Sequence, residues 1–366
     1  MSTLATNAIT DAAGGNTTTI NGYTPTDSNM AGRNRIINGN MLIDQRNAGA
    51  SYTISGDDQY GVDRFAGRTY GGSGRFSMQQ VTDAPEGFSK SLKVTVTTTD
   101  TSGTNGYGIE QRIEGVNISD FNFGSASAKT YTVSFWVKSS VTGTYTFGNR
   151  LGGATASCVN TYTINSANTW EKKTFTFPAN TAFSGVIDNN TGLLCDFGFG
   201  AQTSKSTDTL GVWQAGNYVF NSGQVDLMQT SGATFYITGV QLEAGSVATP
   251  FEHRQYGTEL SLCYRYYEAV GDIVGGTTQQ TLFADNYSAG AGQTTAQFNW
   301  FYRQEKRATP TIAIYGTIVA SNVSGSTIGP LNPTSRNCCL YGSPAGAGRV
   351  YWFNNAGSGF SANAEL

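Results

Sequence analysis

The sequence predicts an all-β protein: a jelly-roll β-sandwich, one short connecting helix and a smaller C-terminal β-sandwich domain. Three observations predict this fold class. The 366 residues include 46 Gly, 19 Tyr and 20 Phe, and Tyr and Phe favour strands whereas Gly favours turns. Charged residues make up only 13% of the chain, so the Glu and Lys that long helices use are scarce. Short segments that alternate between apolar and polar residues recur along the chain.

The clearest strand is expected over residues 129–140. Every second residue from Tyr131 to Val137 is apolar and falls on one face, which is the period of a strand with one buried side. Because no helical crossover separates the expected strands, we expect them to pair antiparallel as a sandwich. Further strands are expected at 92–97, 109–114, 170–178, 193–199 and 235–243, with turns at 102–106 and 148–153.

One helix of about three turns is expected after residue 255, because Leu260, Cys263 and Tyr267 recur at helical spacing. Thr258 is expected to cap its N-terminus. Residues 1–33 hold almost no large apolar side chain, so they form either an unstructured tail or an arm that orders on a partner. The expected domains are the arm at 1–33, the jelly roll at 34–255, the connector helix at 256–268 and a distal β domain at 269–366, with strands at 279–283, 295–302, 310–318 and 349–353.

Composition argues against several classes of protein. The net charge is −3 and no basic stripe occurs, so nucleic-acid binding is not expected. No run approaches the ~18 apolar residues of a membrane helix, and the first twenty residues lack the features of a signal peptide. We therefore expect neither membrane insertion nor secretion through a signal peptide.

Metal and disulfide chemistry find little support in the sequence. The five cysteines are irregularly spaced and His253 is the only histidine, so a zinc site is not expected and the cysteines are interpreted as small buried apolar residues. Any metal site stays unknown and a structural calcium ion is left open, because the acidic loop residues lack EF-hand spacing. Those acidic residues are Asp57, Asp58, Asp63 and Asp100.

A set of ordered motifs gives the sequence a specific resemblance. The motifs are RNRIINGNM at 33–41, DQR at 44–46, VDRF at 62–65, VSFWVK at 133–138, WEKK at 170–173, ITGVQLE at 237–243 and ATPFEHR at 248–254. In this order they resemble a family of bacteriophage structural proteins identified as tail-fibre proteins, over about residues 30–268. The family resembles carbohydrate-binding modules in its jelly-roll fold. The resemblance implies a virion location and contact with the host surface, without identifying a ligand.

From this resemblance we expect a tail-fibre protein, a structural virion component that attaches to the host through a surface glycan or protein. It would be made in the host cytoplasm without a signal peptide and reach the virion tail. Residues 1–33 would bind other virion proteins, and 269–366 would form the receptor-binding tip. A thin distal core and exposed aromatic residues favour a homo-oligomer, and the resemblance implies that it is a homotrimer. The alternative is a purely structural component, such as a head fibre, capsid decoration or adaptor, and the third reading is a glycan depolymerase.

Catalytic chemistry is not expected, and neither is a cofactor. Glu110 and Glu114 share a strand face, but four residues place them about 13 Å apart, farther than the carboxylates of a glycosidase. A serine triad would need His253, and its surroundings contain no nucleophile elbow. We therefore expect no catalytic residue and predict that the protein is not an enzyme.

The candidate ligand contacts are side chains that the strand pattern places on a polar or exposed face. Trp136 points to the polar face of its strand together with Lys138, where it is covered by a loop, covered by a neighbouring subunit, or used for ligand. Glu110 and Arg112 are expected to be exposed, and they join this face only if their strand neighbours that of Trp136. The full set of candidates is Trp136, Lys138, Glu110 and Arg112, with Trp352, Asn354 and Asn355 at the distal tip.

Overall fold

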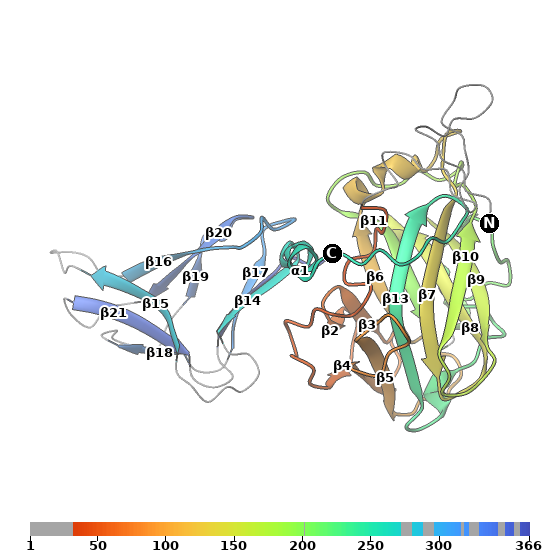
Figure 1. Ribbon diagram of the computed structural model, residues 1–366, viewed down its shortest axis with the longest axis horizontal. Coiled ribbons are helices and arrows are strands. Elements are labelled where there is room, and N and C mark those ends of the chain that lie inside the picture. The colour runs from red at the N-terminus through yellow and green to blue at the C-terminus, as the bar shows by residue number, and fades with distance from the viewer. Residues whose placement is uncertain are drawn as a thin grey trace, which may run out of the picture.

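The structure is a computed structural model that describes residues 32–200, 202–271, 280–287, 296–315, 318–321, 329–342, 348–354 and 359–366. Figure 1 shows two large sheets at one end of the molecule, three small sheets at the other, and helix α1 between them. The described chain is nearly all strand and turn, which confirms the all-β class. No helix within these ranges is long and apolar enough to cross a membrane. The expected arm lies outside the described residues, apart from Gly32 and Arg33.

Six antiparallel strands form the first sheet of the sandwich, in the order β1–β4–β5–β13–β7–β10. The strands expected at 92–97, 129–140, 170–178 and 235–243 all belong to this sheet. Their bounds are β1 (Tyr52–Ile54), β4 (Arg75–Val81), β5 (Ser91–Thr98), β13 (Thr234–Ala244), β7 (Tyr131–Ser139) and β10 (Glu171–Phe177).

Seven antiparallel strands form the second sheet, in the order β12–β9–β8–β11–β6–β3–β2. The turn expected at 148–153 is wrong in its first half, because β8 runs to Leu151 and is paired on both sides, with β9 and β11. Sheet pairing therefore overrides the turn preference of Gly148. The bounds are β12 (Gln214–Ala215), β9 (Ala156–Ile164), β8 (Gly143–Leu151), β11 (Thr191–Gly198), β6 (Gly108–Glu114), β3 (Phe65–Arg68) and β2 (Gln59–Val62).

The main core lies between these two sheets. Every second residue of β7 from Tyr131 to Val137 is fully buried, as the alternation predicts. The Phe135 ring of β7 meets the Phe197 ring of the opposite sheet edge-on, with ring centres 5.0 Å apart. Such edge-to-face contacts add to the free energy gained by burying large aromatic surface. The five cysteines are free, and four of them are buried as the sequence predicts.

The chain beyond residue 266 forms three small antiparallel sheets, β14–β22–β17, β15–β21–β18 and β16–β20–β19. We call this part the second block. Its strands include those expected at 279–283, 295–302, 310–318 and 349–353. Their bounds are β14 (Tyr267–Gly271), β15 (Gln280–Tyr287), β16 (Ala296–Phe301), β17 (Thr311–Tyr315), β18 (Ile318–Ser321), β19 (Gly329–Leu331), β20 (Asn337–Gly342), β21 (Gly348–Asn354) and β22 (Gly359–Asn363).

Helix α1 (Tyr256–Tyr264) confirms the helix expected between the sandwich and the second block. It begins before Thr258, and Gln255 occupies the N-cap position without a side-chain hydrogen bond, so the expected cap is wrong. It also ends before residue 268, because β14 begins at Tyr267. The helix packs against the segment that follows residue 33, through a small apolar cluster of Ile37, Ile43, Leu260, Cys263 and Tyr266.

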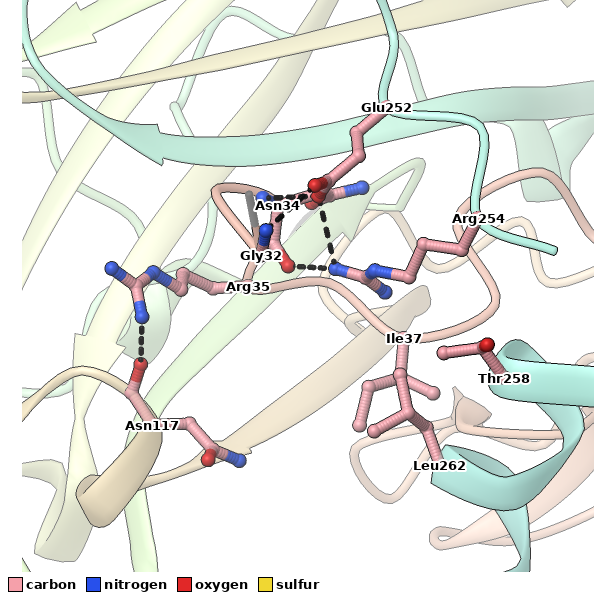
Figure 2. A pocket seen from close by; sticks show the side chains of 9 residues that line it. All are labelled: Gly32, Asn34, Arg35, Ile37, Asn117, Glu252, Arg254, Thr258 and Leu262. Atoms are coloured by element: carbon pink, nitrogen blue, oxygen red, sulfur yellow. Dashed lines mark hydrogen bonds and ion pairs between the residues drawn. The ribbon is translucent and has the colours of Figure 1, made fainter. Parts of the chain in front are cut away.

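Two of the sequence motifs meet beside this helix, although 218 residues separate them in the chain (Figure 2). Glu252 accepts hydrogen bonds from the backbone N–H groups of Gly32 and Asn34, at 2.8 and 2.9 Å. Arg254 donates to the carbonyl oxygens of Asn34 and Ile36. These groups border a pocket of about 380 Å³, but both charged side chains are committed to the N-terminal segment. The motifs here fasten that segment to the sandwich.

Two arginines from other motifs fasten the second block to the sandwich. The Arg64 guanidinium lies 3.4 Å from the centre of the Tyr266 ring and forms an ion pair with Glu365. The Arg46 guanidinium lies 3.7 Å from the centre of the Tyr267 ring and 2.9 Å from Glu365. Because these charges have left bulk water, removing one partner would leave the other charge uncompensated and strongly destabilise the joint.

Asp63 lies at the same joint, where its carboxylate accepts a 2.6 Å hydrogen bond from the side-chain amide of Gln45. Burial raises the pKa of Asp63 to about 6, although Arg46 lies 3.8 Å away and opposes the shift. The folded chain therefore holds this proton more tightly than the unfolded chain. The stability that Asp63 contributes is complete below about pH 4 and is lost as the pH rises through about 6.

We expect Asp63→Asn to remove this pH dependence, because an amide keeps the hydrogen bond from Gln45 and does not titrate. Urea unfolding of both proteins should show the wild type losing up to about 3 kcal/mol relative to the variant between about pH 4 and pH 7. Parallel pH profiles for the two proteins would contradict the raised pKa of Asp63.

Candidate functional site

The outer face of the six-stranded sheet carries a line of basic and aromatic side chains that we call the outer row. Lys93 of β5, Tyr236 of β13 and Lys138 of β7 stand opposite one another across these strands. Trp170 immediately precedes β10, whose first residue pairs with Val137, so Trp170 stands beside Lys138. The outer row therefore alternates lysine and aromatic residues across β5, β13 and β7 to the residue that precedes β10.

Lys138 is enclosed by the side chains around it. Its ammonium nitrogen lies 4.3 Å from the centre of the Tyr236 ring and 5.0 Å from that of Trp170, and it forms an ion pair with Asp83. Asp83 also accepts a 3.2 Å hydrogen bond from the Trp170 indole N–H. The hydrogen bond from Lys138 is the main cause of the lowered pKa of Asp83. Only 8% of Lys138 is exposed, so its charge mainly orients the two rings.

Trp136 lies two residues before Lys138 on the same face, between Thr238 of β13 and Lys172 of β10. Its side chain is half-buried. Its indole N–H has no hydrogen-bond partner in the part of the chain that the structure describes. Because an indole N–H normally finds a partner when it leaves water, this donor is available to a bound molecule.

The loop between β4 and β5 is fastened to the same face by a 2.8 Å hydrogen bond from the Thr238 hydroxyl to the Lys90 carbonyl. The loop brings Asp83 to the outer row and lays Phe88 over Gly239. Gly239 has φ +62 and lies at the β-bulge of β13, and a Cβ there would come within 2.6 Å of the Phe88 ring. Both the left-handed backbone and the close ring therefore require glycine.

Half-buried aromatic rings thus extend across this face from Trp170 to Phe88. The Trp170 and Tyr236 rings are 6.1 Å apart at 70°, and Phe88 continues to Phe251 and His253 at 5.1 and 5.5 Å. Flat rings offer apolar surface, and the neighbouring lysines, hydroxyls and carboxylate offer hydrogen bonds in fixed directions. This combination suits a sugar, because C–H faces can stack on the rings while hydroxyls bind the polar groups.

The structure separates the candidate residues of the sandwich into two groups. Trp136 and Lys138 share the outer face of β7, as expected. Glu110 and Arg112 lie on β6, whose neighbours β11 and β3 belong to the other sheet, so they do not join Trp136. Glu110 is only 1% exposed, and Arg112 is half-buried because it pairs with Glu110 and Asp58, so the expected exposure of both residues is wrong.

The distal candidates cannot be placed beside the outer row, because the side chains of Trp352 and Asn354 and the whole of Asn355 lie outside the described residues. Sequence reasoning missed three members of the outer row, Lys93, Trp170 and Tyr236. A signal was present for the last two, since each is an aromatic residue at a polar-face position of its strand pattern. Their proximity to Lys138 depends on strand order, which the sequence does not contain.

Glu110 takes part in a buried network on the seven-stranded sheet. One guanidinium nitrogen of Arg150 lies 3.0 Å from Glu110 and 2.7 Å from Asp196. Tyr70 and Phe220 pack edge-on above this network, with ring centres 5.6 Å apart, and burial is the largest cause of the raised pKa of Glu110. Both carboxylates are buried and share one arginine, so the network fixes the geometry of these three side chains.

Comparisons with known proteins give distant structural likenesses. No family model matches the chain, and no curated protein matches it. The enzymatically active domain of bacteriophage CBA120 tailspike protein 4 is similar at a TM-score of 0.31 and 13% identity, over 58% of this chain. The chain covers only 21% of that domain.

Carbohydrate-binding modules resemble this chain with TM-scores as low as that of the tailspike domain. The family 11 module of the Clostridium thermocellum cellulase Lic26A-Cel5E gives a TM-score of 0.28 at 16% identity, over 56% of this chain and 99% of the module. TmCBM61, solved with β-1,4-galactotriose, gives 0.29 at 10% identity, over 58% of this chain and 99% of the module. At TM-scores this low, these likenesses carry no argument about function.

The bulge under Phe88 provides a test of how this face is built. We expect Gly239→Ala to destabilise the fold more than Gly232→Ala, measured by urea unfolding. Both glycines have positive φ, but a Cβ at Gly232 meets nothing within 4 Å. The control should cost about 1–2 kcal/mol for left-handed strain, and Gly239→Ala about 1–3 kcal/mol more for displacing the ring. Equal costs would contradict the placement of Phe88 over the bulge.

Proposed function

We propose that this chain is a fibre protein of a bacteriophage virion that attaches to a polysaccharide on the host-cell surface through the outer row and Trp136. The observation that carries the proposal is the grouping of Trp136, Trp170 and Tyr236, all half-buried, on one sheet face. A binding surface needs flat apolar contacts together with a few fixed polar groups. The free indole N–H of Trp136 and the Lys172 side chain supply polar groups beside the rings.

The virion assignment is supported by the ordered motifs. The VSFWVK and WEKK motifs supply Trp136, Lys138 and Trp170, so part of the family pattern coincides with the candidate surface. The RNRIINGNM and ATPFEHR motifs fasten the N-terminal segment, and the DQR and VDRF motifs fasten the second block. This suits a chain that transmits force between a virion and a cell. In the alternative, a purely structural virion component, the same aromatic face would be covered by another virion protein.

We expect Trp170→Ala and Trp136→Ala each to weaken binding to host surface polysaccharide about tenfold or more, because loss of a contacting Trp commonly costs about 2 kcal/mol. Binding would be measured by biolayer interferometry on polysaccharide extracted from the host. Trp170→Phe should retain most of the affinity because it keeps a ring. Phe301→Ala is the matched control, since Phe301 is an aromatic residue of the second block with 69% exposure.

Two results would overturn parts of the proposal. Loss of binding in Phe301→Ala, with the outer-row variants unchanged, would move the glycan contact to the second block. A wild-type chain that binds purified virions but no host polysaccharide would favour the purely structural component. Urea unfolding of each variant separates a lost contact from a lost fold.

A further inference from the structure

A second pocket lies at the joint, between the segment of the sandwich that holds β1 and β2 and the second block. Its volume is about 250 Å³. The sandwich contributes Arg46, Tyr52, Gln59 and Tyr60, and the second block contributes Tyr267 and Asn363. The pocket is therefore formed only where the two parts of the chain meet, and it shares no residue with the outer row.

Two charged side chains line this pocket, and both are paired: Asp58 with Arg68 and Arg112, and Arg46 with two carboxylates. The Arg46 guanidinium lies 4.6 Å from the centre of the Tyr60 ring and 3.7 Å from that of Tyr267. It is held by the carboxylates of Glu365 at 2.9 Å and Asp63 at 3.8 Å. An anionic ligand would gain little from an arginine that has two carboxylate partners, so the pocket favours a neutral molecule.

Several polar groups of the pocket are left without partners. Tyr60 is 9% exposed, yet its hydroxyl has no hydrogen-bond partner among the described residues. The Gln59 amide oxygen accepts from the backbone N–H groups of Ser55 and Gly56, at 2.7 and 3.2 Å. That bonding leaves its NH₂ group as a donor with no partner in the described part of the chain.

Asn363, in the second block, also has a bonded amide oxygen and an NH₂ group without a partner among the described residues. Its amide oxygen accepts a 3.1 Å hydrogen bond from the backbone N–H of Glu365. Its NH₂ group has no acceptor within the described ranges. These donors border the pocket and are open to water, which a ligand could replace. The two amide groups are oriented by their bonded oxygen atoms, so their directions are set before a ligand arrives.

We infer that this pocket binds one ring of a neutral sugar, with its hydroxyls on Tyr60, Gln59 and Asn363 and its C–H face against Tyr52. The volume lies below the roughly 300–1,000 Å³ of sites for drug-sized ligands, which limits the occupant to a single ring. Tyr52 is 39% exposed at the mouth, where its ring offers the stacking surface. The inference goes beyond the proposed polysaccharide contact and does not depend on it.

A ligand in this pocket would touch both the sandwich and the second block. Because a ligand that binds only the folded, joined state stabilises it by mass action, sugar binding would tighten the joint that Arg46 and Tyr267 form.

The test uses the full chain and a panel of free neutral monosaccharides, comprising hexoses, deoxyhexoses and N-acetylhexosamines, with glucuronate as the charged comparison. Saturation-transfer NMR would detect binding and titration would give the affinity, expected at a dissociation constant of about 1 mM because one ring makes few contacts. We expect at least one neutral sugar to bind and glucuronate to bind more weakly.

Tyr60→Phe and Asn363→Ala should each weaken that binding about three- to tenfold, because each removes hydrogen bonds to the sugar. Tyr60→Phe keeps the ring on which Arg46 stacks, so the fold should persist. Trp170→Ala should leave monosaccharide binding unchanged, which separates this pocket from the outer row. Binding by no neutral sugar, binding that survives both pocket variants, or binding lost only in Trp170→Ala would each overturn the inference.

Discussion

The pleat of strand β7 is the constraint on which the rest of the sandwich depends. Successive side chains of a strand point to opposite faces, so the burial of Phe135 and Val137 on one side fixes the direction of Trp136 and Lys138 on the other. A slip of one residue in its pairing would move the whole apolar set to the outer face. The core and the candidate binding face are therefore two consequences of a single register.

The joint between the sandwich and the second block depends on charged contacts and not on strand register. Arg64 and Arg46 each combine a tyrosine ring with a carboxylate of Glu365. Burying charges in this way costs desolvation, and the contacts fix one geometry rather than adding much net stability. That fixed geometry is what positions Tyr267 and Asn363 against Tyr52 and Tyr60 to form a pocket. Arg46 and Arg64, which come from two of the sequence motifs, are used in these contacts.

The sequence predicts local features well and long-range features poorly. Alternation within β7 predicts both its buried face and the shared face of Trp136 and Lys138, because the strand period is a local property. The separation of Glu110 from Trp136 depends on which strands become neighbours, and no pattern within β6 contains that information. The start of α1 before Thr258 shows the same limit, since tertiary contacts of the helix outweigh a capping preference.

Only part of the candidate site on the outer face can be identified from the sequence. Trp136 stands out because it breaks the pattern of its strand, whereas the relation of Tyr236 and Trp170 to Lys138 appears only after three strands are aligned. The loop that carries Asp83 adds a contact that spans 55 residues of chain. Sites built across antiparallel strands are assembled from residues with no fixed spacing, so only the aromatic residues at polar positions indicate them.

Adsorption to cells tests the central claim most directly. Fluorescently labelled full-length chain would be measured for binding to host cells before and after periodate oxidation of their surface glycans, with phage adsorption followed in the same cultures. The account predicts that the chain binds, that it competes with the phage, and that periodate removes the binding. Binding that survives periodate would contradict a glycan receptor, and a chain that neither binds cells nor slows adsorption would contradict the attachment function itself.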